Sequence, residues 1–131
     1  MTAPVLKAVE PELFVADFDR AVAFFTEKLG FAVVFTYGEP PFYGQVKRDN
    51  AALNLRLICE PVFVGDVRER EELLTAAFTV GSAADIRQLY LDFETAGVDF
   101  FRPLKQESWG ARTFIVRDPD GNLLLFAGTA T

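Results

Sequence analysis

The same order of predicted elements occurs twice in this sequence: a strand, a helix and then three strands. Glycines typical of helix ends stand at Gly30 and Gly97, and turn residues follow at positions 48–50 and 117–119. The matching positions are offset by roughly 67–69 residues, which indicates an internal duplication. The duplication favours an α+β fold of two similar βαβββ modules.

Each module is predicted to contain one amphipathic helix with its own start and stop signals. Asp17 or Asp19 can cap the first helix, which ends before Gly30, and the second follows Ser82 and ends before Gly97. Apolar residues recur at helical spacing, namely Phe18, Val22, Phe25 and Leu29 in the first helix and Ile86, Leu89, Tyr90 and Phe93 in the second. We expect these faces to be buried.

The predicted strands are rich in β-branched and aromatic residues and are bounded by turn residues. They cover residues 9–15, 31–37, 43–47 and 52–58 in the first module, and 76–80, 98–101, 113–116 and 123–126 in the second. We therefore expect one domain over residues 1–131, with modules at about 5–59 and 73–128. The charged segment 60–72 is either a solvated connector or a linker that lets modules exchange between chains.

The sequence contains no histidine and a single cysteine, Cys59. It therefore cannot form Ser-His-Asp or Cys-His nucleophilic systems, histidine-based zinc or iron sites, or a disulfide within the chain. Cys59 ends a predicted strand and has no histidine partner. We expect it to be a passive, buried or half-buried thiol.

The chain is acidic, with 13 Lys and Arg against 19 Asp and Glu and a net charge of −6. This charge disfavours nucleic acid as a partner and favours a cationic ligand, although many acidic proteins have no such ligand. No apolar run approaches the about 20 residues of a membrane span, and no signal peptide is visible. We expect a cytoplasmic protein with no membrane partner.

Several motifs resemble those of the vicinal oxygen chelate superfamily, which holds glyoxalase I, extradiol dioxygenases, and fosfomycin and bleomycin resistance proteins. The closest similarity is to the bleomycin resistance proteins, in residues 29–31 (Leu-Gly-Phe), 42–44 (Phe-Tyr-Gly), 108–110 (Ser-Trp-Gly) and 117–122 (Arg-Asp-Pro-Asp-Gly-Asn). The resemblance covers nearly the whole chain. It implies cupped mixed β-sheets with helices outside, and a homodimer with two equivalent clefts at its interface.

In metal-using members of this superfamily, four inward-facing positions hold the ion. The corresponding residues here are Glu10, Asn54, Thr75 and Leu125. Zinc and iron prefer imidazole, thiolate or several carboxylates, and an alkyl group offers no lone pair. We therefore expect no metal and no cofactor.

The resemblance implies a non-catalytic protein that sequesters a cationic, partly aromatic ligand, as in antibiotic resistance by bleomycin binding. Its ligand-binding residues would be Phe42, Tyr43, Phe63, Trp109 and Gly110. In the family pattern, Phe42 and Trp109 line opposite sides of the crevice and sandwich flat rings. The simpler interpretation is that both rings fill one end of the core.

Two other functions remain open at this stage. One is a metal-independent or divergent enzyme of the same superfamily, in which Glu10 acts as a base after burial raises its pKa. The other is a structural module that binds a protein partner, although core packing explains most of the phenylalanines.

Overall fold

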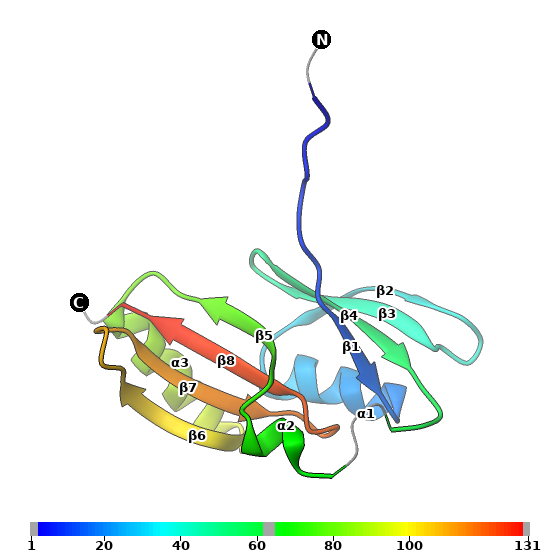
Figure 1. The fold of residues 1–131 in the computed structure, drawn as a ribbon. Coiled ribbons are helices and arrows are strands. Elements are labelled where there is room, and N and C mark those ends of the chain that lie inside the picture. Colours follow the sequence, from blue (N-terminus) through cyan, green and yellow to red (C-terminus); the bar gives the residue numbers. More distant parts are fainter. Residues whose placement is uncertain (1–2, 62–64, 130–131) are drawn as a thin grey trace.

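The computed structural model describes residues 3–61 and 65–129, which form two four-stranded sheets (Figure 1). The strands of the first sheet lie in the order β1-β4-β3-β2. They are β1 (Glu12–Val15), β2 (Ala32–Tyr37), β3 (Tyr43–Arg48) and β4 (Ala51–Leu57). β1 runs parallel to β4, and the other neighbouring pairs are antiparallel.

The second sheet repeats this arrangement in the order β5-β8-β7-β6. Its strands are β5 (Leu74–Thr79), β6 (Asp99–Gln106), β7 (Arg112–Arg117) and β8 (Leu123–Gly128). Again the first strand is parallel to the last, and the other pairs are antiparallel. The shared topology confirms the predicted α+β fold of two βαβββ modules.

Both predicted helices form, and each begins at the expected cap. Asp17 accepts a hydrogen bond from the Arg20 amide at 3.0 Å before α1 (Phe18–Ala23), and Ser82 accepts one from Asp85 at 3.0 Å before α3 (Ala83–Thr95). The first helix differs from the prediction in its last part, where it widens into the π-helix η1 (Phe24–Lys28). Sequence periodicity alone does not distinguish these two helix types.

A continuous apolar core joins the two modules. Phe31 contacts Phe78 edge to face at 6.2 Å between ring centroids, and Phe78 stacks on Phe126 at 4.6 Å. The first ring belongs to the first module and the other two to the second. Figure 1 shows α1 beside the first sheet and α3 behind the second, so each helix covers one face of its own sheet.

Several predicted boundaries and one predicted burial are wrong. β1 begins at Glu12 instead of residue 9, and residues 3–10 form an exposed arm that extends away from the molecule (Figure 1). β6 continues to Gln106 because it pairs with β7 from Asp99 to Gln106, with two shifts of register between these ends. Cys59 is exposed, contrary to expectation, since β4 ends before it at Leu57.

The connector between the sheets contains a short helix, α2 (Val67–Arg70). Arg68 on this helix donates from Nη1 to the backbone carbonyl of Asp120 at 3.0 Å. The described part of the connector is therefore attached to the second sheet at the turn between β7 and β8. None of the helices within the described residues has the length and apolar character needed to cross a membrane.

Candidate functional site

One face of the first sheet is turned away from α1, and we call it the open face. Along β4, Leu53 and Leu55 are buried in the core, so Asn54 and Arg56 point to the opposite face. Tyr43 lies opposite Arg56 in the β3–β4 register, which places its side chain on the open face as well.

An aromatic patch, which we define as Phe35, Tyr37, Phe42 and Tyr43, surrounds the hairpin between β2 and β3. The ring centroids of Phe35 and Tyr43 are 6.1 Å apart, and those of Tyr37 and Phe42 are 5.7 Å apart. A Cβ on Gly38 would lie 2.3 Å from Cδ1 of Phe42, so only glycine lets this ring close onto the hairpin. Phe42 remains 47% exposed. This patch therefore presents aromatic surface to solvent.

Glu12 is a site residue that sequence analysis missed. Its Oε1 accepts a hydrogen bond from the Tyr43 hydroxyl at 2.8 Å, and this bond is the main cause that raises the pKa of Tyr43. We predicted Glu10 as the inward carboxylate, but Glu10 lies in the exposed arm. The alternation of buried Leu13 and Val15 in β1 was the signal that Glu12 faces the other side.

Trp109 stands on a tight turn between β6 and β7. The Gly110 amide donates to the Glu107 carbonyl at 3.0 Å, and the Glu107 amide donates to the Ala111 carbonyl at 2.7 Å. Gly110 has φ +101°, and no described atom lies near the position of a Cβ there. Trp109 is 73% exposed. Neither Trp109 nor Phe42 fills the core, so the interpretation of both as core residues is wrong.

A polar network anchors the base of this turn. Glu107 Oε1 accepts from the Thr113 hydroxyl at 2.7 Å and from Arg102 Nη1 at 3.1 Å. Lys105 Nζ lies 3.8 Å from Glu107 Oε2. The hydrogen bond from Thr113, together with the two nearby cations, lowers the pKa of Glu107. The carboxylate therefore stays ionised.

A single copy does not bring the predicted ligand residues together. Phe42 and Tyr43 lie at the β2–β3 hairpin, whereas Trp109 and Gly110 lie at the β6–β7 turn, at the opposite end of the molecule (Figure 1). None of these four residues lines the cavity of about 480 Å³ that lies between β5 and the β3–β4 turn. Phe63 falls outside the described residues.

The residues at the four metal positions do not suit a divalent ion. Asn54 Oδ1 accepts a hydrogen bond from Gln45 Nε2 at 3.0 Å, and the Thr75 hydroxyl donates to Asn122 Oδ1 at 3.2 Å. Leu125 supplies no donor atom. Among the residues that the structure describes, no group of three or more His, Cys, Asp or Glu side chains could hold a metal.

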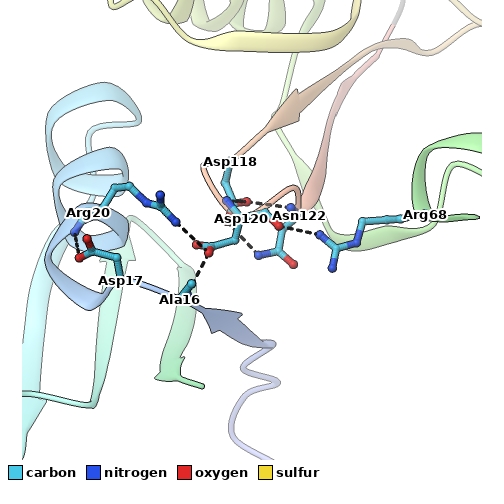
Figure 2. Close-up of polar contacts among 7 residues, drawn as sticks. All are labelled: Ala16, Asp17, Arg20, Arg68, Asp118, Asp120 and Asn122. Atoms are coloured by element: carbon cyan, nitrogen blue, oxygen red, sulfur yellow. Dashed lines mark hydrogen bonds and ion pairs between the residues drawn. The ribbon is translucent and has the colours of Figure 1, made fainter. Parts of the chain in front are cut away.

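Figure 2 shows a second polar cluster, at the junction of the two modules. Asp120 lies in the β7–β8 turn. Its Oδ1 accepts a hydrogen bond from the Ala16 amide at 2.9 Å and another from Nη2 of Arg20, a residue of α1, at 3.1 Å. Asp118 accepts from the amides of Asp120 at 2.9 Å and Asn122 at 2.7 Å. The turn predicted from sequence therefore also joins the modules.

The family model of the Glyoxalase/Bleomycin resistance protein/Dioxygenase superfamily matches residues 7–126. The chain belongs to this superfamily. No curated protein matches it.

Solved structures with a similar fold include the following three proteins. TioX from Micromonospora sp. ML1 is 23% identical over 90% of this chain and 94% of its own, with a TM-score of 0.69. A bleomycin resistance determinant encoded on transposon Tn5 is 20% identical over 96% and 100%, with a TM-score of 0.70. A lactoylglutathione lyase from Agrobacterium tumefaciens is 19% identical over 96% of both chains, with a TM-score of 0.71. At these identities the similarity establishes the fold alone.

Proposed function

We propose that this superfamily member is a non-catalytic binding protein that sequesters a flat, aromatic and cationic small molecule. The observation that carries the proposal is the exposure of Phe42 and Trp109, each on a tight turn beside a glycine with positive φ, Gly38 or Gly110. Exposed rings held on ordered turns offer stacking surface at low entropic cost. A net charge of −6 favours a cationic ligand by long-range attraction.

The proposed cleft requires a second copy of the chain. Phe42 and Trp109 lie at opposite ends of one copy, so a two-fold dimer offers a way for one ligand to contact both rings. The exposed arm supports such a dimer, because Val5 is 87% exposed and Leu6 is 96% exposed. A second copy that covers these side chains would remove their apolar surface from water, which favours association. Two equivalent clefts would result.

The biological effect would be resistance by mass action, since a bound drug is not free to act. A similar fold in a bleomycin resistance determinant supports bleomycin-type compounds as the first ligands to test. An enzyme is less well supported, because Glu10, the candidate base, is exposed on the arm. Cytoplasmic location and the absence of bound metal remain predictions.

Calorimetric titration with bleomycin and with other cationic heteroaromatic compounds tests this proposal. Trp109→Ala and Phe42→Ala should each weaken binding by roughly five- to tenfold, the size of one lost ring-stacking interaction. Leu91→Ala removes an apolar side chain on α3 with the same exposed fraction as Phe42, 47%, and should leave binding unchanged. Absence of binding across the panel would contradict the proposal, as would equal losses in all three variants.

Metal content tests the non-catalytic assignment separately. We expect protein purified without chelator to carry no stoichiometric metal, because the donor set at the four family positions is unsuitable. Elemental analysis that finds about one zinc, manganese, nickel or iron per chain would contradict this expectation.

A further inference from the structure

We propose that Tyr43 and Glu12 form a recognition floor for a flat aromatic cation, in which Glu12 selects for positive charge. The proposal rests on the proposed function and deepens it, since it places the ligand's charge and adds a specificity-determining residue.

The floor follows from the strand order of the first sheet. β4 lies between β1, which carries Glu12, and β3, which carries Tyr43. Adjacent strands are about 4.8 Å apart, so the Tyr43 hydroxyl and the Glu12 carboxylate must reach toward each other across β4. They do so with a hydrogen bond of 2.8 Å. The two side chains therefore lie along the open face instead of standing away from it.

A flat ligand would rest beside a second ring. The Phe35 ring is 6.1 Å from that of Tyr43, at an interplanar angle of 39°. A ligand ring that stacks on Tyr43 gains an edge contact with Phe35 and approaches the rest of the aromatic patch. This places the ligand near Phe42, which the proposed function already requires.

Glu12 lies at the end of this floor with unused acceptor capacity. Oε1 holds the Tyr43 hydroxyl, whereas Oε2 has no hydrogen-bond partner among the described residues. Arg56 is paired with Tyr43 in the β3–β4 register, and its guanidinium lies over the Phe14 ring, 5.9 Å from the ring centroid. A cation on Tyr43 would interact with both the ring face and the carboxylate, whereas a neutral ring would gain only stacking.

Acridine and 10-methylacridinium provide a matched pair of probes. They have nearly the same shape, and 10-methylacridinium is a cation at a pH at which acridine is neutral. Calorimetry should show that the protein binds 10-methylacridinium more tightly than acridine. Glu12→Gln keeps an acceptor for the Tyr43 hydroxyl and removes the charge. It should weaken cation binding about fivefold, as for an exposed ion pair, and leave acridine binding unchanged.

Two control variants separate local charge from net charge. Arg56→Gln removes a cation from the open face and should raise the preference for 10-methylacridinium. Glu94→Gln on α3 changes the net charge as Glu12→Gln does, but on a helix that covers the other sheet, and should leave the preference unchanged. A loss in Glu94→Gln equal to that in Glu12→Gln would overturn the proposal.

The outcomes also distinguish this proposal from the proposed function. If the protein binds both probes with equal affinity, selection by charge is overturned and aromatic binding is left standing. The same conclusion follows if Glu12→Gln weakens the binding of both probes equally. Failure to bind either probe would overturn both. Spectroscopic titration of the tyrosines without ligand tests the contact itself, because Glu12→Ala removes both the acceptor and the charge and should move the Tyr43 titration to lower pH. An unchanged titration would overturn the proposal.

Discussion

Asp118 shows how the environment of one side chain sets its chemistry. Its carboxyl group is buried, and burial raises its pKa from 3.8 to about 6. Hydrogen bonds from Asn122 and from the Asp120 amide act in the opposite direction but do not offset the loss of hydration. The folded protein therefore holds this proton more tightly than the unfolded chain does.

We predict that Asp118 makes the protein less stable as pH rises from about 4 to about 6. Its contribution to the free energy of unfolding is fully present at pH values below the pKa of the unfolded chain. It is lost as the pH rises through the pKa of the folded protein. The full pKa difference corresponds to about 3 kcal/mol. Asp118→Asn should remove this dependence, so its stability relative to the unmodified protein should improve by up to that amount between these pH values.

Urea unfolding at several pH values measures this effect. Asp49→Asn is the control, since Asp49 is an exposed turn residue with φ +52°, a conformation that asparagine also adopts. This control separates the change at Asp118 from the general effect of replacing an aspartate with asparagine. A difference between Asp118→Asn and the unmodified protein that stays constant across the range would refute the prediction.

At the scale of elements, the β6–β7 turn is held by side chains as well as by strand pairing. Thr113 is buried at the start of β7 and links Glu107 with Arg102, whose Nη2 donates to the Thr113 hydroxyl at 3.2 Å. These bonds fix the backbone from which Trp109 projects. The side chain of Trp109 makes no ring contact or hydrogen bond within the described residues, so its order depends on this turn.

Thr113→Val should therefore loosen Trp109 without unfolding the sheet. The variant keeps the shape of threonine and removes one hydroxyl, with an expected loss of about 1 kcal/mol in the free energy of unfolding. Time-resolved fluorescence anisotropy should show larger local motion of Trp109, the single indole. Thr113→Ser restores the hydroxyl and should restore the slower motion; equal motion in both variants would show that the hydroxyl plays no such part.

At the scale of the whole molecule, the two modules are joined by the aromatic core and by the Asp120 cluster. Asp120 lies in the second module, yet its Oδ1 accepts bonds from Ala16 and Arg20 in the first. Its side chain is 10% exposed. A substitution that removes the Asp120 carboxylate leaves the Ala16 amide without its side-chain acceptor.

Asp120→Ala should lower the free energy of unfolding by about 2 kcal/mol, from the lost hydrogen bond and the lost ion pair. Asp120→Asn retains a carbonyl acceptor for the Ala16 amide and should lose less. Denaturant unfolding of both variants measures the difference. Equal losses would show that the contribution of Asp120 comes from its charge and not from its hydrogen bond to the Ala16 amide.

Assembly is tested at the same scale. If the arm is covered by a second copy, Leu6→Ser should shift the equilibrium toward monomer, because a polar side chain would be buried without a partner. Light scattering over a range of concentrations measures this shift against the unmodified protein. A monomer mass for the unmodified protein at micromolar concentration would contradict the proposed dimer.

The sequence by itself determined the features that depend on neighbouring residues. The caps at Asp17 and Ser82, the glycines that end the helices and the turn before Asn122 are short-range signals, and each forms where it was predicted. The duplication then implied the two-module topology, and the absence of histidine excluded whole classes of chemistry.

Only the tertiary structure decided which side chains meet and which remain exposed. Glu12 rather than Glu10 faces Tyr43 because β1 pairs with β4 from Glu12 onward, a contact between residues far apart in sequence. Trp109 and Cys59 are exposed because the strands beside them end or turn before burial. Apolar character favours burial, but whether a residue is buried depends on non-local packing that local sequence patterns do not encode.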